Sequence, residues 1–144
     1  MLTNQPFGKK SSIIFNNEKG EQKDEGLVYN RQDFWTISSN KQSNFVQHIN
    51  TLFNATGRAA TVVPDNILFE GGAGETIRKK LLETTDLHII LRLPTSIFYK
   101  PGVKAYVLFF DKRLASAHRQ AKQVWLYDFR TNMHFTIKQH PMKI

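Results

Sequence analysis

Apolar residues recur three and four positions apart in the stretch 40–54, which predicts an amphipathic helix. The positions are Phe45, Val46, Ile49, Leu52 and Phe53. The preceding residues 39–42 have the pattern of a capping box, with Ser39 as the N-cap, and Gly57 follows as a stop signal. We therefore expect a helix that packs one face against a core.

A second helix is predicted over residues 74–84, with Ile77, Leu81 and Leu82 on its inner face. Four runs read as strands: 59–63, 87–93, 103–110 and 124–129. The first is rich in valine and ends at a proline, as buried strands do. In the second, alternation predicts that one face carries Leu87, Ile89, Leu91 and Leu93.

The order helix, strand, helix, strand predicts a layered α/β sheet with flanking helices. Only nine residues separate Leu93 from Val103, too few for a helical crossover. We therefore expect the strands 87–93 and 103–110 to form an antiparallel hairpin.

Composition adds that the chain is globular. Its 144 residues are 40% hydrophobic and 22% charged, which suits a single domain over residues 1–144. Residues 8–36 are polar without a sustained period, and we expect a long loop there. The chain has no cysteine, no apolar run of about 20 residues and no secretory signal in its first ten residues. These features point to a soluble cytoplasmic protein and exclude a disulfide scaffold.

Net charge is concentrated toward the C-terminus. The chain carries +8, and residues 92–144 hold ten basic residues against two acidic ones, whereas residues 1–91 are balanced. A basic segment of this kind suits DNA, because each neutralised phosphate releases counterions; a merely solubilising face is the alternative. The candidate phosphate contacts are Lys100, Lys104, Lys112, Arg113, Arg119 and Lys122.

A glycine-rich loop at residues 70–75 invites a nucleotide-binding interpretation, since amides at a helix N-terminus can hold phosphate. It lacks the Gly-Lys-Ser/Thr ending of a P-loop, and Glu70 and Glu75 repel phosphate. A simple lead-in to the helix is the other interpretation. The five histidines show no metal-ligand spacing, and we expect no metal.

Several stretches together resemble the second half of the methylase domain in the modification subunits of type I restriction–modification systems. They are AATVVPDNILFEGGAGETIRKKLLETTDLHIILRLPTSIFYKPGVKAYVLFF, then QVWLYDFRTNMHFTIKQHP, and upstream SNKQSNFVQHI. MLTNQPFGKK aligns with the family's Asn-Pro-Pro-Phe motif and the strand before it. The resemblance implies a partial Rossmann-like methyltransferase sheet made of the later strands, including an antiparallel hairpin.

The resemblance also implies a chemistry for the first residues. Family members transfer a methyl group from S-adenosylmethionine to the exocyclic amine of an adenine flipped out of DNA. By that resemblance Asn4 orients the amine, Pro6 holds the turn and Phe7 stacks on the base. The family has proline where this chain has Gln5, which keeps a backbone carbonyl acceptor but loses the fixed φ of proline.

The predicted hairpin loop, residues 94–102, supplies a further candidate. Phe98 or Tyr99 can stack on the target base from the opposite face, as the family's late aromatic motif is thought to do. Packing of both rings on the sheet edge is an equal alternative.

The family's donor-binding motif lies well upstream of Asn4 and is not among these residues. We therefore expect the fragment not to bind S-adenosylmethionine alone. Its partners by resemblance are DNA and the specificity and restriction subunits. We also expect a symmetric homodimer, because Leu2, Thr3 and residues 59–63 form a sheet edge that lacks its neighbouring strands. The alternative function is a non-catalytic DNA-binding or subunit-interaction remnant.

Overall fold

The computed structural model describes residues 1–8, 12–16, 19–26, 28, 30–95, 97–98, 102–114 and 120–130. Its strands are β1 (Leu2–Asn4), β2 (Ser12–Asn16), β3 (Gln22–Gly26), β4 (Arg58–Pro64), β5 (Thr85–Arg92), β6 (Ala105–Lys112) and β7 (Trp125–Asp128). Its helices are α1 (Lys41–Thr51), α2 (Asn66–Phe69) and α3 (Ala73–Thr84). The two long predicted helices and four predicted strands are thus confirmed to within a few residues. No helix of the described residues is long and apolar enough to span a bilayer.

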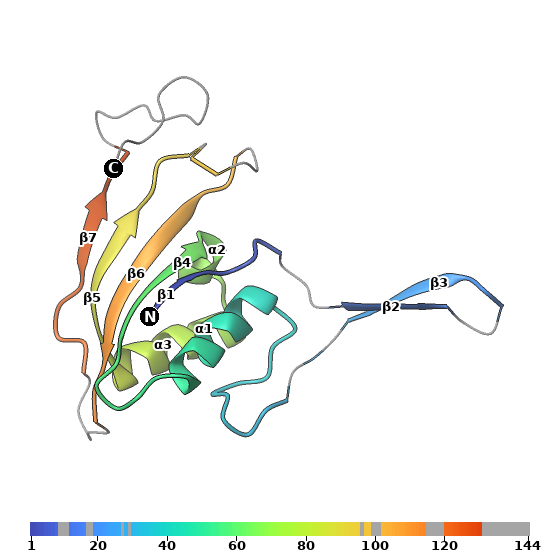
Figure 1. The fold of residues 1–144 in the computed structure, drawn as a ribbon, viewed down its shortest axis with the longest axis horizontal. Helices are drawn as coiled ribbons and strands as arrows, with labels where there is room; N and C mark the ends of the chain where they lie inside the picture. The colour runs from blue at the N-terminus through green and yellow to red at the C-terminus, as the bar shows by residue number, and fades with distance from the viewer. Residues whose placement is uncertain are drawn as a thin grey trace.

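Five strands form one sheet in the order β1-β4-β6-β5-β7 (Figure 1). The pairs β1–β4 and β5–β7 are parallel, whereas β6 runs antiparallel to both of its neighbours. The predicted antiparallel pairing of β5 with β6 is therefore confirmed. β1 lies at the sheet edge as expected, but the expectation that β4 also lies at the edge was wrong, because β4 pairs on both sides.

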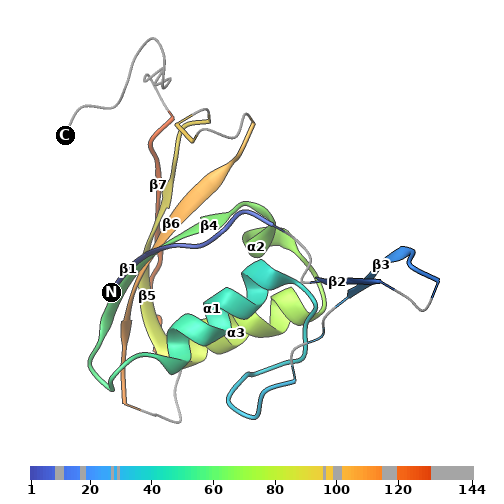
Figure 2. The same ribbon diagram turned by 45° about the vertical axis from the view of Figure 1, so that its right-hand side comes forward.

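The helices α1 and α3 lie side by side on one face of the sheet (Figure 2). A single core joins them to that face; its sheet residues include Val63, Leu87, Tyr106, Leu108 and Phe110. The helices contribute Val46, Ile49, Ile77 and Leu81. All five sheet residues point the same way, because directly paired residues share a face.

The buried side of α1 is more polar than its sequence pattern predicts. Gln42, Ser43, Asn44, Gln47 and Asn50 are buried, whereas Leu52 is exposed. The Gln47 amide donates to the Thr36 carbonyl at 3.1 Å and accepts from the Thr36 N–H at 3.0 Å. This polar side therefore binds the segment that precedes the helix. Asn44 of α1 contributes as well, because its side-chain amide donates to the Ser38 carbonyl.

The N-cap of α1 is Asn40 and not Ser39, which corrects the predicted capping box. The Asn40 side-chain oxygen accepts from the N–H groups of Gln42 and Ser43 at 2.9 and 3.3 Å. Its amide nitrogen donates to the Glu70 carboxylate at 2.6 Å. Asn40 therefore satisfies two free N–H groups of the helix and links α1 to the glycine loop at once.

An irregularity in β5 overturns the prediction that Leu87, Ile89, Leu91 and Leu93 share a face. The register of β5 against β6 shifts between Leu87 and Ile89. A bulge of one residue reverses the alternation beyond it. Leu87 and Ile90 consequently face the helices, whereas Ile89 turns to the opposite side and is 37% exposed.

The long predicted loop at residues 8–36 contains a two-stranded antiparallel hairpin, β2–β3, which projects away from the sheet (Figure 1). Its strands read SIIFN and QKDEG. Neither alternates between apolar and polar residues, which is why periodicity gave no strand signal.

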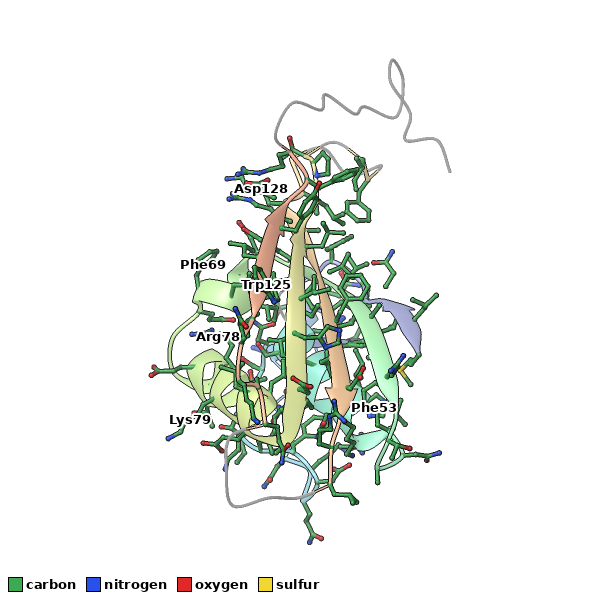
Figure 3. All side chains as sticks on the ribbon, turned by 90° about the vertical axis from the view of Figure 1, so that its left-hand side faces the viewer. Phe53, Phe69, Arg78, Lys79, Trp125 and Asp128 are labelled. Carbon is green, nitrogen blue, oxygen red and sulfur yellow. The ribbon has the colours of Figure 1, made fainter. Side chains whose placement is uncertain are left out.

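The second face of the sheet carries no described helix; Figure 3 views it obliquely, with α2 and α3 to the left of the strands. By strand register this face, here termed the open face, carries Leu2, Asn4, Arg58, Ala60, Val62, Asp86, Ile89, Leu91, Val107, Phe109, Asp111, Trp125 and Tyr127. Most of these side chains are apolar, and Leu2, Trp125 and Tyr127 are largely exposed. The sheet thus has one packed face and one unpacked face.

Candidate functional site

Several strands finish at the same end of the sheet. The register places Asn4 beside Val62, Pro64 beside Ala105, and Arg92 beside both Tyr106 and Asp128. β1, β4, β5 and β7 therefore end where β6 begins. In open α/β sheets, ligands bind beyond the carboxyl ends of the strands. We call this edge the site end, and residues 4–7 leave the sheet there.

Asn4 is the last residue of β1, and its side chain is exposed. Because Asn4 pairs with Val62, it projects on the open face and not toward the helices. Its amide makes no hydrogen bond with any residue that the structure describes. An exposed amide at the carboxyl end of a strand is available to accept and donate hydrogen bonds to a ligand.

Gln5 lies on the other side of the backbone from Asn4. Its side chain is only 1% exposed, and neither its nitrogen nor its oxygen has a hydrogen-bond partner among the described residues. An unpaired buried amide costs about 1–3 kcal/mol. The side chain at position 5 is therefore buried at a cost in stability.

Phe7 contacts Phe98 across the site end. Their ring centroids are 5.1 Å apart and the ring planes are inclined by 68°, an edge-to-face arrangement. The structure therefore brings together two segments, the first residues of the chain and the loop between β5 and β6, that the sequence singled out separately. A base enters between these rings only if they separate, because the edge-to-face contact leaves no gap. Tyr99 lies outside the described residues.

The candidate phosphate contacts do not form one patch. Lys104 is exposed at the site end, whereas Lys112 and Arg113 lie at the opposite end of β6, roughly 26–30 Å away at the rise of a strand. Lys122 is also near that far end, since the adjacent Ala121 N–H donates to the Leu82 carbonyl. Lys100 and Arg119 lie outside the described residues.

Two of these cations have structural partners. The Lys112 ammonium donates to the carbonyl oxygens of Asn50 and Phe53 at 2.8 and 3.3 Å. The ammonium group therefore caps the C-terminal end of α1, where the carbonyl groups lack hydrogen-bond partners within the helix. Arg113 pairs with Asp86 at 3.0 Å. Lys104 alone among the described candidates is both exposed and located at the site end.

The site end also contains a cationic cluster, Arg92 and Arg130 around Asp128, that was not predicted from the sequence. Arg130 donates to both carboxylate oxygens of Asp128 at 2.8 and 2.5 Å, and Arg92 approaches the same carboxylate at 3.8 Å. The hydrogen bonds from Arg130 lower the pKa of Asp128 to about 2. Arg92 also lies over the Tyr106 ring. The spacing Asp128-x-Arg130 hints at the local pair, but Arg92 joins it only through the pairing of β5 with β7.

The glycine loop has a structural role in this fold. Gly72 adopts a φ of 58° immediately before α3, a conformation that favours glycine. Arg78 donates to the carbonyls of Ile67 and Glu70 at 3.0 and 2.6 Å, and Glu70 accepts from Asn40. These contacts join α1, α2 and α3, which favours the lead-in interpretation over phosphate binding.

Two cavities lined by described residues differ from a methyl-donor pocket. One cavity of about 420 Å³ lies on the helix side and is lined by apolar residues and two arginines, with no carboxylate for ribose hydroxyls. A second hollow of about 430 Å³ lies at the far end of the open face, beside Arg58 and Asp111. Neither adjoins Asn4.

Comparisons with known proteins place these observations in a family. The sequence pattern of the family described as N-6 DNA Methylase matches residues 1–144. The EcoKI methylase subunit of Escherichia coli K12 is 55% identical over 100 residues, which cover 67% of this chain and 19% of that protein. The EcoEI methylase subunit of Escherichia coli is 40% identical over 85 residues, 58% of this chain and 16% of that protein. The chain thus spans about a fifth of these relatives.

Solved structures agree. The crystal structure of the EcoKI M protein superposes with a TM-score of 0.71 at 41% identity, over 98% of this chain and 27% of that one. A type I modification subunit from Vibrio vulnificus YJ016 superposes with a TM-score of 0.64 at 26% identity, over 99% and 28% of the two chains. These matches confirm the predicted Rossmann-like methyltransferase sheet. The chain belongs to the N-6 DNA methylase family.

Proposed function

We propose that this chain forms the target-adenine side of an adenine-specific DNA methyltransferase of the type I modification class. The observation that carries the proposal is the site end. There the exposed amide of Asn4 and the Phe7–Phe98 pair meet at the carboxyl ends of the strands. The family match and the 55% identity to a methylase subunit support the proposal.

In the proposed mechanism, the side-chain oxygen of Asn4 and the backbone carbonyl of Gln5 accept hydrogen bonds from the adenine amine. The amine lone pair then points toward the methyl carbon of S-adenosylmethionine, the second substrate. A carbon–nitrogen bond forms as the carbon–sulfur bond breaks, the electron pair of the broken bond stays on sulfur, and the nitrogen loses one proton to solvent. The contribution of these residues is positioning and electrostatics. Phe7 stacks on the flipped base, and Phe98 or Tyr99 closes the opposite face.

The DNA backbone is held, in this proposal, mainly by cations at the site end. Lys104 is exposed there, and Arg92 and Arg130 together outweigh the single charge of Asp128. Lys100 and Arg119 remain candidates from the sequence, whereas the carbonyl contacts of Lys112 argue against a phosphate role for it. The proposed partners are DNA and the specificity and restriction subunits of a type I system, in the cytoplasm.

We further propose that the isolated chain self-associates as a symmetric dimer. β1 is an edge strand, and Leu2 on it is 87% exposed. An uncovered strand edge favours pairing with another copy, and two-fold dimers are the commonest closed assembly.

The decisive test of the proposed function is a chimera. The matched segment of the EcoKI methylase subunit is replaced by this chain, so that the EcoKI specificity subunit supplies the recognition sequence. We expect methyl transfer to DNA that falls by several hundredfold in Asn4→Ala, in the range found for single oxyanion donors, about 10²–10³. Lys79→Ala, an exposed change on α3, is the matched control and keeps the parent rate. A folded chimera in which Asn4→Ala methylates at the parent rate refutes the assignment.

The second candidate is a non-catalytic DNA-binding or subunit-interaction remnant. Gln5 favours it, since the buried amide replaces the proline that fixes the family's turn. The same chimera separates the two candidates: a remnant assembles and binds DNA but transfers no methyl group, even after Gln5→Pro.

A further inference from the structure

We propose that a groove on the helix side of the sheet docks an acidic amphipathic helix of a separate polypeptide, which in a type I system is the restriction subunit. The inference rests on the proposed function and adds a partner surface to it. It is carried by the shape of the groove, by its charge and by its place relative to the site end.

The groove lies between the helices α2 and α3 and the strands β5 and β7, and its volume is about 420 Å³. Phe69 of α2 and Leu126 of β7 lie at its border and are 73% and 66% exposed. Figure 3 shows Phe69 and Arg78 on the helices beside β7. The floor includes apolar side chains that pack on the core: Leu68, Leu82, Ile90 and Val124. Exposed apolar side chains around a concave apolar floor mark an interaction site.

The helix layer ends before β7. Neighbouring strands lie about 4.8 Å apart and packed helices about 8–10 Å apart, so one helix covers about two strands. Two long helices, α1 and α3, lie side by side on the five-stranded sheet (Figure 2). Leu108 of β6 is 2% exposed beneath them, whereas Leu126 of the edge strand β7, on the same face, is 66% exposed. A third helix beside α3 continues the layer over β7 and fills the groove.

The charge of the groove selects the kind of helix. Among the residues that the structure describes, no Asp or Glu lines the groove, whereas Arg78 and Arg92 do. Arg78 uses one guanidinium nitrogen for two backbone carbonyls, and its other nitrogens make no hydrogen bond with a described residue. Arg92 lies 3.8 Å from the carboxylate of Asp128, which Arg130 already binds.

Both guanidinium groups of the groove therefore have N–H donors left for a carboxylate, the partner that suits their planar geometry. The matching helix carries apolar side chains at positions i, i+3 or i+4, and i+7, with Asp or Glu beside this stripe.

The position of the groove identifies the polypeptide. Asn4 projects on the open face of β1, so the target base and the methyl donor meet on the other side of the sheet. The specificity subunit has to contact the DNA beside the site end. The groove adjoins β7, the edge strand opposite β1, and opens on the helix side. A subunit docked there touches neither the base nor the donor, which suits the restriction subunit because methyl transfer has no step for it.

The test is association, measured without methyl donor and without DNA, since Arg92 also faces the site end. The probe is the purified EcoKI restriction subunit, because the EcoKI methylase subunit is 55% identical to this chain over 100 residues. We expect a one-to-one complex with the full chain by sedimentation. Leu126→Lys and Phe69→Lys, each folded by circular dichroism, should weaken it by about tenfold or more, as loss of a buried apolar anchor does. Arg92→Gln should weaken it by about tenfold through the lost carboxylate contact.

Trp125→Lys is the matched control. Trp125 precedes Leu126 in β7 and is 64% exposed, but it projects on the open face. This substitution should therefore leave the affinity for the restriction subunit unchanged. An equal loss of affinity in Trp125→Lys and Leu126→Lys overturns the inference, because the contact then does not depend on the groove.

The same variants are placed in the chimera with the EcoKI specificity subunit, so that a partner that requires the complete methylase is also detected. The inference is refuted if the restriction subunit binds neither the folded chain nor the chimera, or binds both equally well after Leu126→Lys. Binding of the specificity subunit, or self-association, that Leu126→Lys abolishes without an effect on the restriction subunit also refutes it, since the groove then has another occupant.

The chimera keeps this inference separate from the proposed function. Methyl transfer is measured there without the restriction subunit and should be unchanged by Leu126→Lys, because Leu126 lies on the helix side, away from Asn4. A failed association thus leaves the catalytic test intact, and a chimera without methyl transfer still reports the association.

Discussion

Phe7 and Phe98, ninety-one residues apart in the chain, meet edge to face with their ring centroids 5.1 Å apart. An aromatic pair of this kind contributes about 0.5–1.5 kcal/mol beyond its buried area. A base stacked on an aromatic ring contributes about 1–3 kcal/mol. In the proposed mechanism a flipped adenine can therefore replace the ring contact, and we interpret the pair as a closed state that the base would open.

This competition predicts unequal effects of the two rings. Phe7→Ala removes the stacking platform and should lower kcat/KM for DNA in the chimera by about 5- to 150-fold, the equivalent of 1–3 kcal/mol. Phe98→Ala removes one stacking face but also the contact that the base must break, so its loss should be smaller. Steady-state methyl transfer measures both. Equal losses, or a larger loss for Phe98→Ala, contradict the closed-state interpretation.

The buried amide of Gln5 predicts a gain in stability on removal. Gln5→Met keeps the length and flexibility of the side chain and deletes two unpaired polar atoms, so the free energy of unfolding should rise by about 1–3 kcal/mol. Urea unfolding of the isolated chain measures the change.

Gln47→Met is the matched control, because Gln47 is equally buried but its amide is hydrogen-bonded to Thr36 and Asn44. It should lower the free energy of unfolding by a similar amount, since it leaves the backbone groups of Thr36 unpaired. Destabilisation by both substitutions shows that Gln5 has a partner after all.

Restoring the family's proline at position 5 tests the backbone. Gln5→Pro fixes φ near −65° and removes the buried amide, so the acceptor carbonyl should be better preorganised. We expect kcat in the chimera to rise while KM for DNA changes little. An unchanged kcat means that the backbone of Gln5 is already well placed.

The sequence predicted the regular parts of the fold because their signals are local. Helical spacing located α1 and α3, and the short separation of Leu93 and Val103 was enough to predict the antiparallel pairing of β5 and β6. The bulge near His88 was not predictable in this way. Its signal is a shift of pairing with β6, and no residue of the LHIIL run marks it.

The site was predictable only in part, for the same physical reason. Asn4 and Phe7 were singled out by resemblance and Phe98 by its place in a loop, but only tertiary pairing brings Phe98 onto Phe7. Counting charges placed Lys104 and Lys112 in one basic segment. An extended strand separates them, and the carbonyls of α1 occupy Lys112. A count of charges along the sequence does not show that a lysine is already bound to backbone carbonyls.

We therefore expect separable roles for Lys104, which lies just before β6, and Lys112, which is the last residue of β6. Lys104→Gln should weaken DNA binding and reduce the slope of log K against log salt by about 0.9, the value for one lost phosphate contact. Lys112→Gln should leave that slope unchanged but lower the free energy of unfolding by about 1.5–3 kcal/mol, because a charged group leaves the carbonyls of Asn50 and Phe53. Binding at several salt concentrations and urea unfolding measure the two effects. A reduced salt slope for Lys112→Gln contradicts the division.

Asp128 predicts a pH dependence confined to strong acid. The hydrogen bonds from Arg130 lower its pKa in the folded chain from 3.8 to about 2. A carboxyl with a lowered folded pKa binds fewer protons than in the unfolded chain, so its stabilising effect is complete above pH about 4 and disappears as the pH falls through about 2. Because Asp128 and Arg130 are solvent-exposed, the effect on stability is small, and the titration itself is the better measurement.

We expect the carbon resonance of the Asp128 carboxyl to titrate near pH 2 in the parent chain and close to 3.8 in Arg130→Gln. Arg113→Gln, which removes a guanidinium from Asp86 instead, is the control and should leave the Asp128 titration where it was. A midpoint near 3.8 in the parent chain means that the Arg130 hydrogen bonds do not persist in solution.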